Sequence, residues 1–247
     1  MVSNREKTGN VFCMLTSCQN EFIMQIDTMS EWIYEKNLWR RTMPKGSPER
    51  TAARKEEIIN ACEKLYQTMS FKDITLKEIG NETSFSRPTI YNYYQTKEEI
   101  FLALFEREYV RWNEELTSIL EKNKTLSKKQ LAKKLATSIA NREQLLKLLA
   151  MNNYDMEANS RPELLTSFKV AYGESLRIVG SIISKFCPEK PEQEVKTILY
   201  VFFPFMFGIY PYTSVTDKQK DAMEQAGVGF TYQTVFELTN NCLLKLL

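Results

Sequence analysis

The run FSRPTIYNYYQTKEEI at positions 85–100 concentrates the side chains of this sequence that are best suited to bind another molecule. It holds an arginine, an asparagine, three tyrosines and two threonines, placed directly before a predicted helix start. Such side chains reach phosphate oxygens and base edges without deep burial. The run therefore favours recognition of nucleic acid, with a plain solvent-exposed segment as the alternative.

The sequence contains no histidine, and this absence removes several kinds of catalytic and metal-binding site at once. Histidine triads, histidine metal sites and imidazole general bases are all excluded. The sequence also lacks a GxGxxG motif, a Walker loop and an HExxH motif. No acidic pair stands out from the charged helix faces. We therefore expect a protein that is not an enzyme, with no cofactor and no metal.

The composition indicates a globular protein built from helices. Of the 247 residues, 43% are apolar and 26% are charged, which is typical of a globular chain rather than a disordered one. Eight glycines and eight prolines are few for this length and favour helices over turn-rich β structure. Five scattered cysteines without a CxxC spacing indicate reduced thiols and a cytoplasmic protein.

An uncharged stretch at 197–216 is the segment that most resembles a membrane span. Its apolar part, 198–209, has the length of a buried helix, and Pro204 and Pro211 interrupt the stretch. We therefore expect a core helix here and no membrane as a partner. The net charge of +2 points to no partner of either sign.

Helical patterns precede and follow the run at 85–100. Apolar residues at three- and four-residue steps predict a helix from 51 to about 70, and they are Ile58, Cys62, Leu65, Tyr66 and Met69. Thr75 and Glu78 have the spacing of a capping box, which predicts a short helix to about 82. Thr96 and Glu99 repeat that spacing at the start of a long helix.

Between these elements, Ser86 can cap a second short helix that tolerates Pro88 in its first turn. Residues 47–95 are thus predicted to form three helices, the last two of them short and joined by a tight polar turn. This order is the helix-turn-helix layout, in which the second short helix enters the major groove of DNA. We expect Ile90 and Tyr94 to face inward as packing residues.

The segment ITLKEIGNETSFSRPTIYNYYQTKEEIFLALFE, at 74–106, resembles the DNA-binding domain of the TetR/AcrR family of bacterial transcriptional regulators. The similarity covers about 56–105, and the motifs of that family occur here in the same order. The turn differs, because Thr83, Ser84 and Phe85 stand where the family often has Ala-Gly-Val. No glycine is present there to ease a left-handed backbone.

The resemblance implies double-stranded DNA as a partner and a set of contact residues. These residues match DNA-contact positions of the family or lie next to such positions, and they are Thr75, Lys77, Ser86, Arg87, Pro88, Thr89, Tyr91, Asn92, Tyr93 and Lys97. Among them, Thr75, Lys97 and the aromatic residues Tyr91 and Tyr93 match positions that contact phosphate in the family. Arg87, Pro88, Thr89 and Asn92 match positions in the recognition helix. Charge alone would not have indicated DNA, because the nine cations between 44 and 100 are balanced by nine acids.

The rest of the chain reads as all-α. Helical apolar stripes occupy 126–139, 142–151, 162–186, 191–210 and 230–247, while the polar stretch 213–220 reads as a connection. The fold class is therefore all-α, with a helix-turn-helix domain at 44–95 and a helical effector-binding and dimerisation domain at 96–247. Residues 1–43 form an extension that is disordered or comes from a mis-assigned start, or else an arm that packs on the domain or touches DNA.

The resemblance implies that the last two helices pair into a four-helix bundle in a homodimer. Their stripes are more than a monomer is expected to cover, and they comprise Ile198, Phe202, Phe205, Met206 and Ile209 with Val235, Leu238, Cys242 and Leu246. Aromatic residues of this half could line a cavity for a small hydrophobic or aromatic effector. The candidates are Trp112, Tyr154, Phe168, Tyr172, Phe202, Phe205 and Met206, each of which could equally be plain core.

These observations together predict a homodimeric, ligand-responsive transcriptional regulator, and we expect a repressor that binds a palindromic operator. Two other classes remain open: a helical enzyme with a carboxylate site, and a protein-interaction module without DNA binding. Asp155, Glu157 and Glu174 could select a cationic effector, but solvated surface carboxylates are the simpler interpretation.

Overall fold

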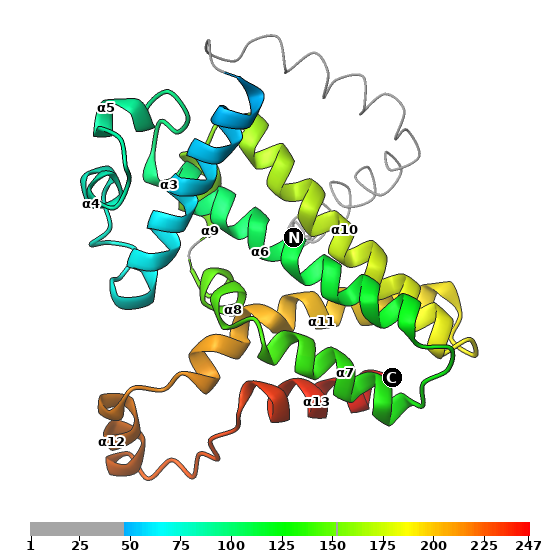
Figure 1. Ribbon diagram of the computed structural model, residues 1–247. Coiled ribbons are helices and arrows are strands. Elements are labelled where there is room, and N and C mark those ends of the chain that lie inside the picture. The colour runs from blue at the N-terminus through cyan, green and yellow to red at the C-terminus, as the bar shows by residue number, and fades with distance from the viewer. Residues whose placement is uncertain (1–46, 152) are drawn as a thin grey trace, which may run out of the picture. The chain divides into compact units, whose positions relative to one another are not determined.

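The computed structural model describes residues 47–151 and 153–247. In these residues the chain forms helices and connecting turns and no strand (Figure 1). The chain divides into two units, Met1–Thr51 and Ala52–Leu247, and the second one carries the features discussed below. The predicted extension at 1–43 lies outside the described residues, so its two interpretations stay predictions, as do the domain boundaries.

The four helices of the N-terminal part are α3 (Pro48–Thr68), α4 (Leu76–Asn81), α5 (Arg87–Ile90) and α6 (Lys97–Lys122). Helix α3 forms along the predicted stripe, since Ile58, Cys62 and Tyr66 are buried. Helix α6 has the predicted apolar face, which is buried from Phe101 to Leu116. Ile90 and Tyr94 face inward, as predicted.

The two threonine caps are confirmed, but neither helix begins with a complete capping box as predicted. The hydroxyl oxygens of Thr75 and Thr96 accept hydrogen bonds from the N–H groups of Lys77 and Glu99, each at 3.2 Å. The Glu78 carboxylate accepts a hydrogen bond from the Thr75 hydroxyl. The Glu99 carboxylate accepts from the N–H of Gln95 at 2.7 Å, because Arg161 draws it away from the cap.

The C-terminal part consists of α7 (Lys128–Ala140), α8 (Glu143–Leu149), α9 (Asn153–Ala158), α10 (Pro162–Phe186), α11 (Glu192–Thr213), α12 (Asp217–Gln225) and α13 (Val235–Leu246). Five of these agree with the predicted helices, although α13 begins five residues later than 230. Helices α9 and α12 were not predicted. The prediction of a connection over 213–220 is wrong from Asp217 onward, because Thr216 and Gln219 form a complete capping box there.

The core of this part lies where α10 packs along α6 and where α11 packs against α8, α10 and α13. These neighbours bury four of the five residues of the predicted α11 stripe within one chain, and Phe205 is half-buried; the buried residues are Ile198, Phe202, Met206 and Ile209. The expectation that a monomer could hardly cover this stripe is therefore wrong for α11. One chain covers the predicted stripe of α13 only in part, as expected, because Val235, Leu238, Cys242 and Leu246 are half-buried.

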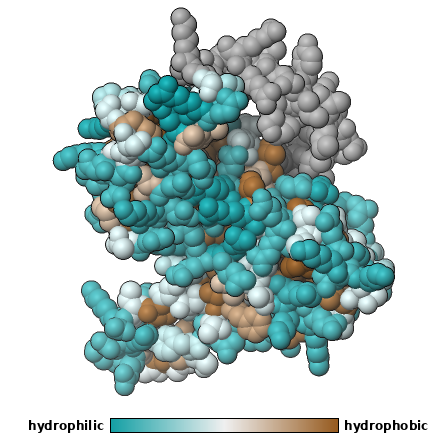
Figure 2. All heavy atoms as spheres, viewed as in Figure 1, coloured by the Kyte–Doolittle hydropathy of each residue, from teal (hydrophilic) through white to brown (hydrophobic). Residues whose placement is uncertain are grey.

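Helix α11 is the one helix in the described part of the chain that is long and apolar enough to cross a membrane, by length and composition alone. One face of it lies in the core as predicted, and Pro204 and Pro211 stand inside it. Its opposite face is exposed and apolar. On the face of the molecule drawn in Figure 2, most of the surface is hydrophilic and the hydrophobic side chains form small separate patches.

Candidate functional site

The α4–α5 pair is held together by a close approach at Gly80. A Cβ atom at this position would lie 3.3 Å from the Cβ and 3.5 Å from the Cα of Arg87, so a larger residue would push the two helices apart. The turn needs no glycine, because side chains satisfy its backbone. The Thr83 hydroxyl lies 3.0 Å from the carbonyl oxygens of both Gly80 and Phe85, and the Ser84 N–H donates to the Glu57 carboxylate.

Most of the residues predicted to contact DNA lie exposed on this pair of helices and its flanks. The exposed ones are Thr75, Lys77, Ser86, Arg87, Pro88, Tyr91 and Asn92. Ser86 begins α5 as predicted but makes no side-chain cap to the backbone, since its hydroxyl lies 3.3 Å from that of Thr89.

Arg87 and Tyr91 form one exposed unit at α5. The Nη2 of Arg87 donates to the Tyr91 hydroxyl at 3.1 Å, and the guanidinium lies 5.9 Å from the ring centre. Arg87 forms no ion pair with any residue that the structure describes. A guanidinium without a carboxylate partner can bind a phosphate or the O6 and N7 atoms of guanine.

The other three predicted contacts, Thr89, Tyr93 and Lys97, are half-buried. The Tyr93 hydroxyl accepts from Nη1 of Arg54 at 3.3 Å, and that guanidinium also lies 5.6 Å from the Phe85 ring. Arg54 thus adds a cation to this surface that the motif comparison missed. Its one signal in the sequence is its place in the segment 45–55, which holds four cations and a single acid.

Lys97 is engaged inside the protein. Its ammonium donates to the carbonyl oxygens of Phe71 and Ile74 at 2.7 and 3.0 Å, and it lies 4.3 Å from the Phe71 ring centre. These contacts hold the turn that precedes α4. Lys97 therefore has a structural role beside any contact with phosphate.

A second set of contacts connects the end of the helix-turn-helix region to α10. The buried Glu99 carboxylate forms a two-point ion pair with Arg161, at 2.7 and 2.9 Å, and Arg161 also donates to the carbonyl oxygen of Tyr93 at 2.8 Å. Burial alone would raise the pKa of Glu99, but hydrogen bonds from Arg161 and the Gln95 N–H outweigh burial and lower it. Arg161 immediately precedes α10, so a shift of that helix would reach Tyr93 directly.

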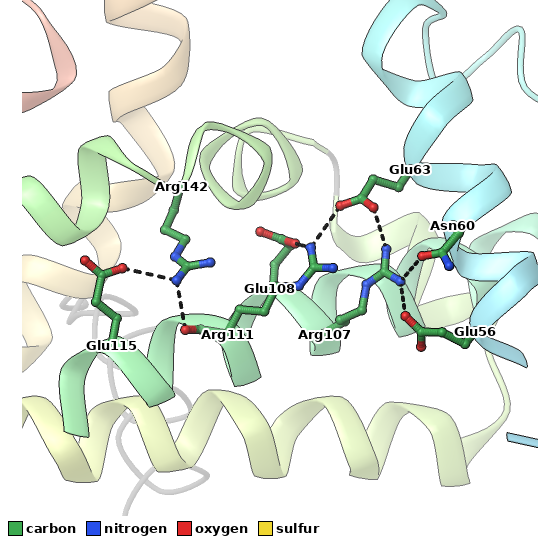
Figure 3. A network of polar contacts seen from close by, with 8 residues as sticks. All are labelled: Glu56, Asn60, Glu63, Arg107, Glu108, Arg111, Glu115 and Arg142. Carbon is green, nitrogen blue, oxygen red and sulfur yellow. Dashed lines mark hydrogen bonds and ion pairs between the residues drawn. The ribbon is translucent and has the colours of Figure 1, made fainter. Parts of the chain in front are cut away.

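A polar network joins α3 to α6 and α8 (Figure 3). Arg107 of α6 binds Glu56, Asn60 and Glu63 of α3 at 2.5 to 2.9 Å. Arg111 joins Glu63 to the buried Glu108 of α6 at 3.0 and 2.6 Å. Arg142, just before α8, donates to the Arg111 carbonyl oxygen and to Glu115, at 3.0 and 3.1 Å.

The predicted effector residues are mostly brought together as one aromatic cluster in the core. Ring contacts of 4.8 to 6.4 Å run from Phe168 through Phe105 and Tyr109 to Tyr172 and Trp112, and on to Phe203, Phe202 and Phe205. Met206 is fully buried. Phe105, Tyr109 and Phe203 were not among the predicted ligand residues. Phe105 and Tyr109 lie on the apolar face of α6, whereas Phe203 of α11 lies outside the predicted stripe of its helix. Tyr154 stands apart, with 85% of its surface exposed on α9.

Two polar groups accompany the cluster. Trp112 Nε1 donates to the Ser138 hydroxyl at 3.1 Å, so its polar atom is satisfied. Asn113 donates to the carbonyl oxygen of Ala171 at 2.9 Å, but its own side-chain oxygen is buried without a partner. Among the described residues, no group of three or more carboxylates or cysteines could hold a metal ion.

Two family models match this chain and together cover most of the described residues. One, described as bacterial regulatory proteins of the tetR family, matches residues 58–104. The other, described as the C-terminal domain of tetracyclin repressor-like proteins, matches residues 106–242, which is more than half of the chain. No curated protein sequence is similar enough to count as a relative.

Solved structures of similar fold include transcriptional regulators from several bacteria. FadR from Bacillus subtilis, solved in complex with stearoyl-CoA, has a TM-score of 0.51 and 16% identity over 77% of this chain and 96% of its own. A putative TetR-family regulator from Mesorhizobium loti MAFF303099 has a TM-score of 0.52 and 16% identity over 80% and 96%. A transcriptional regulator from Cytophaga hutchinsonii has a TM-score of 0.51 and 17% identity over 77% and 96%.

The similarity to these solved structures supports the fold. The family is shown by the two family models, which match residues 58–104 and 106–242. They confirm the resemblance that the motifs at 74–106 indicated. The chain belongs to the TetR family and is a DNA-binding transcriptional regulator.

Proposed function

We propose that the protein is a repressor that binds a palindromic operator as a homodimer and leaves it when a small effector binds the C-terminal part. The observation that supports the DNA-binding surface is the exposed α5 edge, which consists of the Arg87–Tyr91 unit and of Asn92 in the turn after α5. Helix α5 itself is held close to α4 at Gly80. In a dimer, two such edges would enter successive major grooves about 34 Å apart.

The experiment that tests this surface is selection of duplexes from random DNA, followed by titration of the selected duplex. Binding should weaken steeply with salt, because each neutralised phosphate contributes a slope of about −0.9. Arg87→Ala and Asn92→Ala should each cost about 1–3 kcal/mol and relax the preferred base at one position. Lys133→Ala on the exposed face of α7 is the control and should bind as the parent protein does. The surface is wrongly placed if both Arg87→Ala and Asn92→Ala bind the duplex as the parent protein does.

The homodimer is supported by the exposed apolar face of α11. Tyr200, Val201 and Phe207 are 45%, 45% and 39% exposed, and Pro204 and Pro211 lie on the same side of the helix. Apolar side chains at this spacing form one stripe along a helix, and such a stripe is typical of an interface. The half-buried residues of α13 would extend it.

The effector site that we propose is the aromatic cluster around Phe168, Tyr172 and Trp112, and the effector is a small hydrophobic or planar aromatic compound. The unpartnered Asn113 oxygen lies beside α10 and would accept a hydrogen bond from a hydroxyl or N–H group of such a compound. The protein with the bound stearoyl-CoA shares the fold, but here rings fill the core, so an effector has to displace some of them.

A thermal-shift screen of planar aromatic compounds, followed by release of the selected duplex, tests the effector site. Phe168→Ala and Tyr172→Ala should lower effector affinity while duplex binding persists. Stabilising compounds that never alter duplex affinity would show that the two sites are uncoupled. The matches to the two regulator family models support a cytoplasmic regulator rather than an enzyme.

The route between the two sites is proposed to run through α6 and α10. The Glu99–Arg161 pair connects α10 to the backbone of Tyr93, while Arg107 and Arg111 connect α6 to α3. An effector that separates α6 from α10 would therefore act on both ends of the helix-turn-helix region. This is a coupling of two sites through shared rigid elements.

A further inference from the structure

A pocket of about 380 Å³ opens where α3 ends, between α8, the end of α11 and α12. The left side of Figure 2 is hollowed between the end of α3 and α12. The walls of the pocket include Tyr66, Phe71, Lys147, Tyr210, Ser214 and Gln219. The volume falls within the range of about 300–1,000 Å³ that small-molecule sites occupy. None of these residues belongs to the aromatic cluster or to the α5 edge.

Lys147 supplies one wall with a cation that forms no ion pair with a described residue. Its ammonium donates to the carbonyl oxygen of Tyr66 and lies 4.0 Å from the centre of the Tyr66 ring. In return, the Tyr66 hydroxyl donates to the Lys147 carbonyl oxygen at 3.4 Å. Within the described residues Lys147 forms no ion pair, and its ammonium is held by a carbonyl oxygen and a ring face. Burial lowers the pKa of Lys147, and the nearby Glu143 raises it to a smaller extent.

The opposite walls add further donors and a flat apolar surface. The hydroxyls of Tyr210 and Ser214 make no hydrogen bond to another described residue. The side-chain oxygen of Gln219 accepts from Thr216, which leaves the amide N–H groups of Gln219 for a ligand. Phe71 and the rings of Tyr66 and Tyr210 supply aromatic surface. One fixed cation, several hydroxyl or amide donors and aromatic walls together suit an anionic group attached to a planar apolar body.

We propose that this pocket binds a small aromatic carboxylate, with the carboxylate at Lys147 and the ring between Phe71 and Tyr210. The site is distinct from the effector site proposed above. It touches the DNA-binding region directly, because the Phe71 carbonyl oxygen is held by Lys97 and its ring contacts Phe101 at 4.8 Å. A ligand here therefore bridges the turn before α4 to α8, α11 and α12.

Paired probes test the proposal: 1-naphthoate and its neutral amide, 1-naphthamide, titrated calorimetrically into the full chain. The naphthoate should bind about ten-fold more tightly than the amide, since a hydrogen bond to a charged group adds that much. Lys147→Met should abolish this preference. Lys133→Met, the same change on the exposed face of α7, should preserve it.

Because Lys147 also holds α3 to α8, a second variant keeps the test independent of that contact. Ala150→Phe places a ring at an exposed position on the pocket wall and should reduce binding of both probes at least ten-fold without lowering the Tm. Hydrogen exchange with bound naphthoate should show protection at 66–73 and 147–151. Equal binding of the two probes, an unchanged Kd in Ala150→Phe, or protection confined to other segments would each overturn the proposal.

Discussion

Single residues at the predicted DNA contacts divide into side chains that face solvent and side chains that hold the protein together. Lys77 and Lys97 show the division, because the family motif matches Lys97 to phosphate and Lys77 stands beside the matched Thr75. Lys77 is exposed and its ammonium forms no hydrogen bond or ion pair with a described residue. The Lys97 ammonium is bound to the carbonyl oxygens of Phe71 and Ile74. Charge reversal or removal should therefore act on different properties at the two positions.

Replacement of Lys97 by Met should lower the free energy of unfolding by about 1–3 kcal/mol, because two part-buried carbonyl oxygens lose a charged donor. Lys77→Met is the matched control and should leave the free energy of unfolding within about 0.5 kcal/mol of the parent value. Denaturant titration measures both. Lys77→Met should instead weaken all duplexes to a similar extent. Equal stability of the two variants would remove the structural role assigned to Lys97.

The role of Lys97 was not visible in the sequence for a physical reason. Its acceptors are backbone carbonyl groups 26 and 23 residues earlier, and a backbone carbonyl has no residue type that a pattern could detect. The threonine caps were predictable because Thr75 and Thr96 act within their own helix turn. The glutamate half of the second cap failed because Arg161, 62 residues later, competes for Glu99.

Among the helices, those with a buried apolar face were predictable and those without one were not. Helix α12 buries no residue, so it has no stripe, and its capping box at Thr216 and Gln219 was its one signal. The α4–α5 pair was predictable as two short helices. Its tightness was not, because the closest approach involves Gly80, whose importance depends on Arg87 of the next helix.

Replacement of Gly80 by Ala tests how closely α4 and α5 pack. Alanine favours a helix over glycine by about 0.5–1 kcal/mol, but here its Cβ would meet Arg87 at 3.3 Å. Gly173 of α10 is the matched control, since a Cβ there meets nothing within 4 Å. Gly173→Ala should raise the free energy of unfolding by about 0.5–1 kcal/mol. Gly80→Ala should gain less and should also weaken the selected duplex, because α5 is displaced. If both substitutions raise the free energy of unfolding equally and duplex affinity is unchanged, α5 moves to accommodate the alanine without loss of DNA binding.

For the whole molecule, assembly depends on apolar surface that one chain leaves exposed. Val201 of α11 and Val110 of α6 are 45% and 43% exposed, and Val201 alone belongs to the proposed interface stripe. Val201→Glu should convert the dimer to a monomer, because a carboxylate in a closed apolar interface lacks a partner. Val110→Glu should remain a dimer. Sedimentation equilibrium distinguishes the two, and a dimer that survives Val201→Glu places the interface elsewhere.

The link between the DNA-binding region and α10 should appear in the pH dependence of stability. The pKa of Glu99 is lowered in the folded protein, so the stabilisation by its pair with Arg161 is complete above the unfolded value of about 4.3. As the pH falls through the lower folded value, Glu99 is protonated and this stabilisation is lost. The difference in the free energy of unfolding between the parent protein and Glu99→Gln should therefore be constant from about pH 6 to 8 and shrink below about pH 4.

Glu98→Gln is the matched control for this measurement, since Glu98 is the adjacent residue and forms no ion pair with a described residue. At neutral pH, Glu99→Gln should lower the free energy of unfolding by about 1–3 kcal/mol, because Arg161 loses a charged acceptor. The hydrogen bond from Arg161 to the Tyr93 carbonyl oxygen is then held less firmly. Glu98→Gln should cost less than about 1 kcal/mol, the size of a helix-dipole effect. Denaturant titrations between pH 3 and 8 give both series. If the free energy of unfolding changes with pH in the same way for Glu99→Gln and Glu98→Gln, the ion pair does not hold α10 to the end of the helix-turn-helix region.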